Sequence, residues 1–204
     1  MRSRVGLIWL ILLSLFPASN VLAEEPWQPV LTDNDIIIHK RERQIGLIEI
    51  RAQMVTMTSL EACMRLLSDA ESVSKWVDHA KEATILKRIS PNEYLVQTIF
   101  SAPWPSSNRD MITYSTIYQP DKNTLILTVK DAHQSLPKQT GLVRITDVQA
   151  NWTVQKLSNG MTHISYTAYA NPNGIIPVWL ANEITINSVS STFQNLKKRL
   201  PLYQ

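Results

Sequence analysis

The sequence contains one cysteine, Cys63, and only five glycines among its 204 residues. A single cysteine excludes an internal disulfide bond. With so few glycines, the chain has no P-loop, no G-x-G-x-x-G dinucleotide fingerprint and no G-x-S-x-G nucleophile elbow. Cys63 lies in the apolar helical run LEACMRLL, where a reactive thiolate is disfavoured, so it is predicted to be a small buried residue.

An excess of charge of one sign is also lacking. The formal net charge is +3, and removing the first 23 residues lowers it to +1 because Arg2 and Arg4 are lost. The sequence has no block of like charges and no alternation of basic and aromatic residues, so no nucleic-acid partner is predicted. Residues 40–43, Lys-Arg-Glu-Arg, are the densest basic spot, and the interposed glutamate favours a solvated strand face over an anion site.

Histidines with the spacing of metal ligands are absent as well. The four histidines fall in different predicted elements and form neither an H-x-x-x-H nor an H-E-x-x-H pattern, so no zinc site is predicted. No other metal and no cofactor is expected. The histidines are His39, His79, His133 and His163.

The first 23 residues have the pattern of a secretory signal peptide. Arg2 and Arg4 precede the apolar run VGLIWLILLSLF, and small residues follow up to Val21-Leu22-Ala23. This run is shorter than the ~20 residues that a membrane-spanning helix needs, which favours a cleaved signal over an uncleaved anchor. We therefore expect residues 24–204 to form one mature domain in the bacterial periplasm or outside the cell.

After an irregular stretch with prolines at positions 26 and 29, the mature chain begins with a β-hairpin. Apolar and polar residues alternate over residues 47–56, as in a half-buried antiparallel strand, and residues 35–43 supply its partner. Thr58 or Ser59 can cap a helix that follows. Its apolar face is predicted to contain Leu60, Cys63, Met64 and Leu67, and residues 70–79 are predicted to continue helically with Trp76 inward.

Strand and turn patterns fill the middle of the chain. Turn sequences such as Ser158-Asn159-Gly160 separate short β-rich runs, which is typical of consecutive antiparallel strands. The strands are predicted at residues 83–89, 94–101, 109–118, 124–130, 142–157 and 161–170.

The longest predicted element is a helix over residues 174–200. Pro177 suits its first turn, and residues 197–199 place three cations in its last turn, where the helix dipole favours them. Apolar residues recur along it at spacings of three to five, so one face is apolar and must be covered. They are Ile176, Leu180, Ile184, Val189, Phe193, Leu196 and Leu200.

This order of elements predicts an α+β fold in which a curved antiparallel sheet wraps around the long C-terminal helix. A bent sheet closed by one helix encloses a concave, mostly apolar space of the kind that binds small ligands. The pattern leaves open whether that space is empty or filled by side chains.

Four segments carry a resemblance to a known family. Residues 102–110, APWPSSNRD, resemble the P-W-P-x-x-x-R-D segment of the steroidogenic acute regulatory protein-related lipid-transfer (START) domains. Residues 137–144, PKQTGLVR, are similar to the family's P-x-x-x-G-x-[VI]-R, and Trp152 resembles the tryptophan of its next long strand. Residues 171–182, NPNGIIPVWLAN, resemble D-P-x-G-x-[IL]-P-x-W-L-x-N, with Asn171 where the family often has Asp.

The resemblance covers about residues 35–200 and implies the helix-grip fold, with an internal tunnel for a lipid or another hydrophobic molecule. It implies binding or transfer without bond chemistry, so the protein is not expected to be an enzyme. The terminal helix and the loop near residues 132–141 would gate the tunnel. Transient membrane contact is compatible with this role.

The residues predicted to contact the ligand come from these segments. Arg109, Met111 and Thr113 share one face of a strand, although the pattern does not decide which face is inward. Arg109 and its neighbour Asp110 could each instead form a structural ion pair. Trp104 could plug a corner of the sheet, and Trp152 could belong to the core. The full predicted set is Trp104, Arg109, Met111, Thr113, Leu136, Trp152, Ile176, Leu180 and Ile184.

Two alternative functions stay open from the sequence. Polyketide cyclases and aromatases use a related fold, and an enzyme of that kind would draw on Arg109, Tyr114, His163 and Tyr169, which form no recognisable constellation. If side chains fill the cavity, the protein would instead be an interaction module with an envelope protein as its partner.

Overall fold

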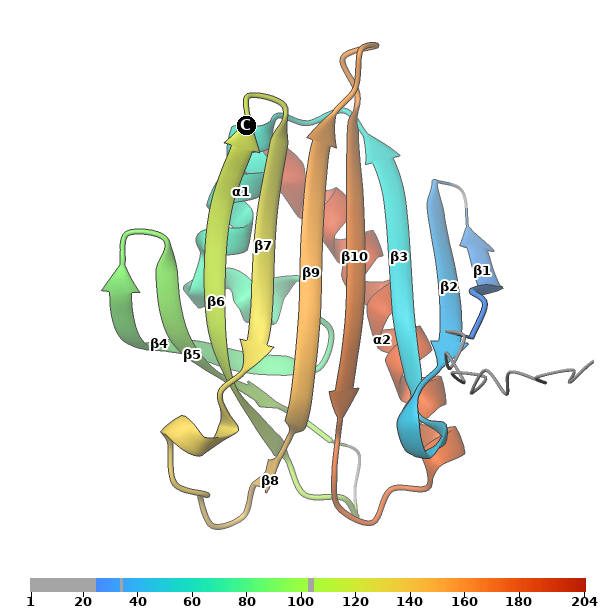
Figure 1. The fold of residues 1–204 in the computed structure, drawn as a ribbon, viewed down its shortest axis with the longest axis vertical. Coiled ribbons are helices and arrows are strands. Elements are labelled where there is room, and N and C mark those ends of the chain that lie inside the picture. The colour runs from blue at the N-terminus through green and yellow to red at the C-terminus, as the bar shows by residue number, and fades with distance from the viewer. Residues whose placement is uncertain (1–24, 34, 103–104) are drawn as a thin grey trace, which may run out of the picture.

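Residues 25–33, 35–102 and 105–204 are described by a computed structural model of the chain (Figure 1). The predicted signal peptide, residues 1–23, lies outside the described residues and stays a prediction. No helix in the described part is long and apolar enough to cross a membrane.

One large sheet dominates the fold. Its strand order is β1-β2-β3-β10-β9-β7-β6-β5-β4, with antiparallel pairing throughout this path and a short parallel pairing of β8 with β6. The strands are β1 (Gln28–Asp33), β2 (Ile36–Glu42), β3 (Ile48–Thr56), β4 (Ala80–Ser90), β5 (Glu93–Phe100), β6 (Arg109–Asp121), β7 (Thr124–Asp131), β8 (Val143–Arg144), β9 (Thr146–Lys156) and β10 (Thr162–Asn171).

Helices cover one face of this sheet. Figure 1 shows α2 crossing behind the strands, with α1 near one end of it. The helices are α1 (Leu60–Ser68) and α2 (Val178–Arg199), with short 3₁₀ turns η1 (Gln44–Gly46), η2 (Ala70–Lys75), η3 (His133–Ser135) and η4 (Leu200–Tyr203). The predicted α+β, helix-grip architecture is confirmed.

The structure adds a strand that the sequence pattern does not indicate. β1 contains Pro29, and its register with β2 shifts between Pro29 and Leu31. Proline cannot donate a ladder hydrogen bond, so it is tolerated here because β1 is the edge strand. Just before β1, the ring of Trp27 lies 4.6 Å from the Arg41 guanidinium and 4.0 Å from that of Arg51, which fastens this edge to β2 and β3.

The first helix begins where the capping signal predicts. The Ser59 side chain accepts a hydrogen bond from the Ala62 N–H at 3.0 Å, so α1 starts at Leu60. Its buried face contains Leu60, Ala62, Cys63 and Leu66, and Met64 is exposed, so the predicted face is wrong at that residue.

Residues 70–79 form only the short η2 turn. Asp69 ends α1 and caps the start of η2, because its side chain accepts a hydrogen bond from the Ser72 N–H at 3.2 Å.

Cys63 is buried, as expected from its apolar run. Burial raises the pKa of its thiol to about 12, which keeps it protonated at neutral pH. It belongs to the main core, where α1 and the second half of α2 pack against β2, β3, β9 and β10.

The C-terminal helix is shorter than predicted at its start. Pro177 has an extended backbone (φ −57°, ψ 140°) and is the N-cap, so α2 begins at Val178. Its buried residues are concentrated toward the C-terminal half, including Thr192, Phe193 and Leu196. This half is held in the core, and the first half is more exposed.

Candidate ligand-binding cavity

A cavity of about 310 Å³ lies between the sheet, η2 and α2. It is lined from β4–β7, β9 and β10 on the sheet side and from η2 and the middle of α2 on the helix side. The volume is near the lower end of the ~300–1,000 Å³ typical of small-molecule sites. The structure therefore does not have the filled interior on which the interaction-module alternative depends.

Strand parity fixes which side chains reach the cavity. On β6 the residues Met111, Thr113 and Ser115 face inward, and on the neighbouring β5 the inward residues include Val96 and Thr98. This answers the question that the β6 pattern leaves open. The opposite face of β6 also contains an apolar residue, Ile112, which is fully buried. The Ile112 carbonyl accepts a hydrogen bond from the Ala132 N–H at the start of the β7–β8 loop.

An aromatic wall separates the cavity from the core. Trp152 of β9 lies face to face with Phe193 of α2 at 5.7 Å and 9°, and its ring centre is 4.3 Å from that of Tyr166 on β10. Trp76 meets Trp152 edge-on at 6.0 Å. These contacts lock the rings in place and provide a rigid apolar surface for a ligand.

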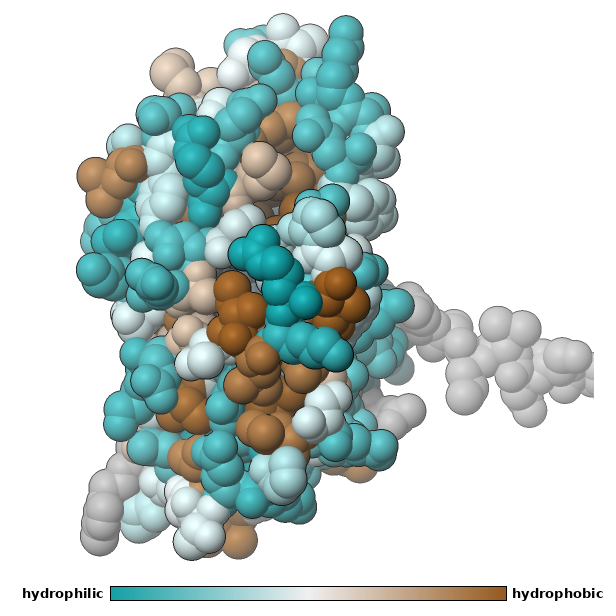
Figure 2. Space-filling view, turned by 90° about the vertical axis from the view of Figure 1, so that its left-hand side faces the viewer, coloured by the Kyte–Doolittle hydropathy of each residue, from teal (hydrophilic) through white to brown (hydrophobic). Residues whose placement is uncertain are grey.

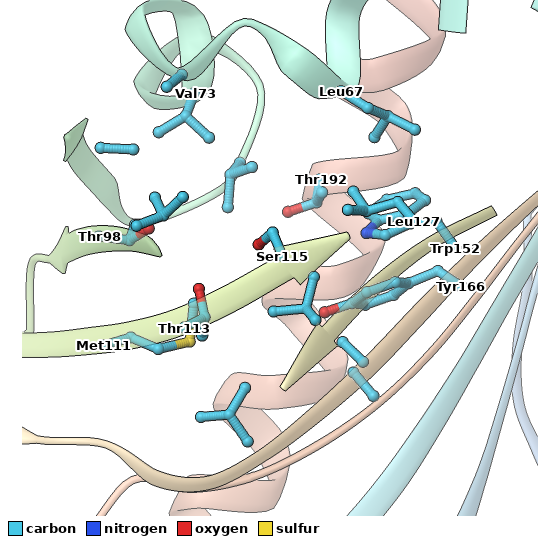
Figure 3. A pocket seen from close by; sticks show the side chains of 18 of the residues that line it. Leu67, Val73, Thr98, Met111, Thr113, Ser115, Leu127, Trp152, Tyr166 and Thr192 are labelled. Atoms are coloured by element: carbon cyan, nitrogen blue, oxygen red, sulfur yellow. The ribbon is translucent and has the colours of Figure 1, made fainter. Parts of the chain in front are cut away.

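Hydroxyl groups supply most of the polarity inside. Figure 3 shows the side chains of Thr113 and Ser115 from β6 and the hydroxyl of Tyr166 pointing into the same space. Burial raises the pKa of Tyr166 to about 12, and no hydrogen bond contributes to that shift. Thr192 on α2 is already engaged, because its hydroxyl accepts from the Asp78 N–H at 3.0 Å.

The cavity lining reaches the surface on the side of β4. Ile85 belongs both to the lining and to the exposed apolar residues. Figure 2 shows this side of the molecule, where apolar side chains form a band between polar ones.

The structure brings together three of the residues predicted from the sequence. Met111, Thr113 and Trp152 all line the cavity, with Trp152 also part of the core. Trp104 lies outside the described residues, so its predicted contact is not tested. Sequence reasoning missed Tyr166, Thr98 and Thr192, of which Tyr166 could have been found from the alternation along residues 161–170.

The predicted α2 contacts are displaced along the helix. Ile176 precedes α2, and Leu180 and Ile184 are half-buried near its start, outside the lining. The helix residues that line the cavity are Ser188, Val189 and Thr192. Two of them carry hydroxyls, so a search for apolar periodicity passes over them.

Arg109 shares the inward face of β6 but lies beyond the end of the cavity. Only 7% of its surface is exposed, and its Nη1 donates to the Ser107 carbonyl at 2.8 Å. Gly174 passes close to it: a Cβ added there would lie 3.7 Å from Nη2. Burial lowers the pKa of Arg109. This position joins the start of β6 to the loop before α2.

Asp110 and Arg144 form the structural ion pair that the sequence left open. Arg144 Nη2 and Nε each lie 2.8 Å from an Asp110 carboxylate oxygen, and the two side chains are 1–2% exposed. Arg144 also donates to the carbonyls of His133, Leu136 and Pro137. Leu136 therefore contributes its backbone carbonyl to the binding of Arg144, and its side chain does not line the cavity.

The residues that an enzyme would need are not assembled. Tyr169 lines the cavity, whereas Arg109, Tyr114 and His163 do not. Tyr114 and His163 lie at outward positions of β6 and β10, and His163 Nε2 is 3.3 Å from Gln53 Nε2 on β3.

Comparison with known proteins places the chain in a family. The model described as START domain matches residues 18–204. The chain belongs to the START domain family. The solved STAR-related lipid transfer protein of Xanthomonas axonopodis (fragment 25–204) has a TM-score of 0.78 and 26% identity, covering 86% of this chain and 98% of that one.

Two relatives also match over most of their length. The Pseudomonas aeruginosa protein PA1579 is 25% identical over 187 residues, covering 88% of this START domain chain and 89% of that protein. The phosphatidylcholine transfer protein of Homo sapiens is 23% identical over 192 residues, covering 89% and 87%. The named activity among these similar proteins is lipid transfer, which supports lipid binding in general.

The buried ion pair gives a stability prediction. Arg144→Met leaves the Asp110 carboxylate buried without its partner, so we expect the free energy of unfolding to fall by about 3–5 kcal/mol. Lys197→Met is the matched control, because it breaks the exposed pair with Asp35, worth less than about 1 kcal/mol. Urea unfolding monitored by tryptophan fluorescence measures both, and equal losses would contradict the assignment.

Tyr166 gives a prediction at high pH. Its pKa is about 12 in the folded protein, against about 10 when unfolded. The neutral Tyr166 side chain therefore makes its full contribution to the free energy of unfolding below about pH 10, and this contribution is lost as the pH rises toward 12. Titration of tyrosinate absorbance should show a late step that Tyr166→Phe removes and Tyr118→Phe, at an exposed site, retains. Because the pKa values of Tyr114 and Tyr169 are also raised, the assignment would be wrong if Tyr166→Phe left the amplitude of the late step unchanged.

Proposed function

We propose that this protein binds one hydrophobic molecule, a lipid or a compound of similar polarity, in the cavity and carries it without making or breaking bonds. The observation that carries the proposal is the internal cavity of about 310 Å³, lined mainly by apolar and aromatic side chains, in a START domain. Removing apolar ligand surface from water supplies the affinity, at about 25 cal/mol per Å².

The placement of the residues considered for an enzymatic use supports a carrier that makes and breaks no bonds. Of the four residues that an enzymatic use would require, all within the described chain, three lie away from the lining. A general acid or base must be within hydrogen-bond reach of its substrate, so Tyr114 and His163 cannot serve a molecule held in the cavity.

We also propose that the protein docks transiently on a membrane through an apolar end patch, formed by Ile45, Ile175, Val178 and Trp179. Ile175 is 97% exposed, Ile45 70% and Trp179 67%. The turn and the helix start that carry them are adjacent, because Val178 lies 3.4 Å from where a Cβ of Gly46 would be. Tryptophan favours the membrane–water interface, and aliphatic neighbours add apolar area that can enter it.

Ile45 gives the end patch a second supporting observation. Its backbone is left-handed (φ 55°, ψ 25°), which is rare and unfavourable for a β-branched residue. Holding such a residue with its apolar side chain in water is explained if the side chain enters a membrane during part of the transfer cycle.

For location, we propose export from the cytoplasm. The support is the sequence of residues 1–23, in which two arginines precede an apolar run and small residues lead to Ala23.

Native mass spectrometry tests ligand binding and export together. The full chain, produced in a Gram-negative host and recovered from the periplasm, should have the mass of residues 24–204 plus one co-purified hydrophobic molecule. Ala150→Trp should reduce that occupancy at least tenfold, because the new ring occupies the cavity. Asn151→Trp is the control, since the next residue of β9 faces solvent.

Circular dichroism establishes that the Ala150→Trp protein is folded, and Ala168→Leu replaces it if it is not. Equal occupancy in a folded cavity variant and in Asn151→Trp would overturn the carrier proposal. A full-length mass in the periplasmic fraction would overturn cleavage after Ala23 and leave ligand binding intact.

Vesicle sedimentation tests the end patch. The double variant Ile175→Ser and Trp179→Ser should lower the fraction bound to vesicles at least fivefold. Leu202→Ser is the control, because Leu202 is also 70% exposed but lies beyond the other end of α2. Identical vesicle binding by the double variant and Leu202→Ser would refute docking through the end patch.

A further inference from the structure

The polar groups of the cavity define what kind of head group it can hold. The Trp76 indole lines the cavity with a buried Nε1 donor that has no hydrogen-bond partner. The inward-pointing hydroxyls include those of Thr113, Ser115 and Tyr166 (Figure 3). They come from β6 and β10, on either side of the space. A hydroxyl can donate one hydrogen bond and accept others, so this set suits an alcohol or carbonyl oxygen.

The charged groups of the lining are both negative. Asp69 and Asp78 lie at the η2 side, and Asp69 is held by the Tyr203 hydroxyl at 2.5 Å and by the Ser72 N–H. The hydrogen bond from Tyr203 is the main cause that lowers the Asp69 pKa, which keeps this carboxylate ionised. Among the described lining residues there is no Lys, Arg or His to pair with an anion.

The buried arginines Arg109 and Arg144 lie outside the lining of the cavity. Arg109 lies beyond the cavity, where its Nη1 donates to the Ser107 carbonyl and its buried Nε has no hydrogen-bond partner. Arg144 is occupied by Asp110 and three carbonyls. An ionised phosphate or carboxylate that entered would lose its water without gaining a paired charge, which is strongly unfavourable.

The volume restricts the ligand further. A saturated chain that spans half of a ~30 Å bilayer core and packs about 4.5 Å from its neighbours fills on the order of 300 Å³. The cavity of about 310 Å³ therefore has room for at least one such chain or a compact equivalent. A phospholipid brings two chains as well as a phosphate.

We infer that the ligand is an uncharged hydrophobic molecule, about the size of one acyl chain, with an alcohol or carbonyl oxygen that bonds to Tyr166 and Thr113. This rests on the proposed carrier function and sets the chain apart from its phosphatidylcholine-transferring relatives. The head group is selected by hydroxyls and by the exclusion of anions.

Matched probes test the inference on the mature protein after its own ligand has been removed. At pH 8, dodecan-1-ol and dodecanoate have the same chain but differ in head-group charge, dodecane lacks the oxygen, and dipalmitoyl phosphatidylcholine is offered in vesicles. Native mass spectrometry with equal probe concentrations should show dodecan-1-ol bound at least tenfold more than dodecanoate or the phospholipid. Equal or greater occupancy by either charged probe overturns the inference but leaves the carrier function standing.

Tyr166→Phe tests the hydroxyl without changing the ring. One hydrogen bond is worth about 0.5–1.5 kcal/mol, so dodecan-1-ol should bind about 2–10-fold more weakly, with dodecane unaffected. Thr113→Val, which also keeps the side-chain shape, should act in the same way. A loss of dodecane binding would show that the hydroxyls are structural, and failure of all four probes to bind would overturn the carrier function itself.

Discussion

The stack of Trp152 on Phe193 is the contact on which the rest of the architecture depends. It joins the middle of the sheet to the second half of α2, and Trp76 and Tyr166 complete the cluster around it. Because large rings fill the interior here, the sheet and helix are held at a fixed distance. Beyond this cluster the same two layers continue apart, and the side chains are too small to close the gap between them.

A folded chain normally avoids such a space, since every atom at its wall forgoes dispersion contacts. Here small residues line much of the sheet side, including Ala150 on β9 and Ala168 on β10, next to the large rings. The alternation of small and large side chains along β9 and β10 thus creates the cavity and also stabilises its boundary. The main core on the other side of the rings compensates for the packing contacts that are missing around the cavity.

The fold was largely predictable because its signals are local. Alternation over residues 47–56, the Ser59 cap and the turn at 158–160 each act within a few residues, and four START motifs fix the order. β1 was not predictable, because Pro29 is acceptable only once the segment is known to be an edge.

The cavity was harder to predict, because its lining depends on what covers each face. Ile112 is fully buried although it faces away from the cavity, and its carbonyl accepts from the Ala132 N–H at the start of the β7–β8 loop. Apolar character on β6 therefore does not identify the inward face. On α2 the cavity meets Ser188 and Thr192, whereas the strongest apolar spacing points to Leu180 and Ile184. The core obeys hydrophobic periodicity, but a cavity wall that contains hydroxyl-bearing residues need not.

The start of α2 and the β7–β8 loop, the two segments predicted to gate the cavity, are held by bonds of unequal strength. At the start of α2, the Asn182 side chain accepts from the Ile48 N–H at 3.2 Å and donates to the Gly46 carbonyl at 2.9 Å. These are neutral bonds, worth about 0.5–1.5 kcal/mol each, whereas breaking the Asp110–Arg144 pair under the β7–β8 loop costs about 3–5 kcal/mol. Under the proposed carrier function, breaking the Asn182 hydrogen bonds is therefore the easier way to admit a ligand, and it frees first the helix end that carries the end patch.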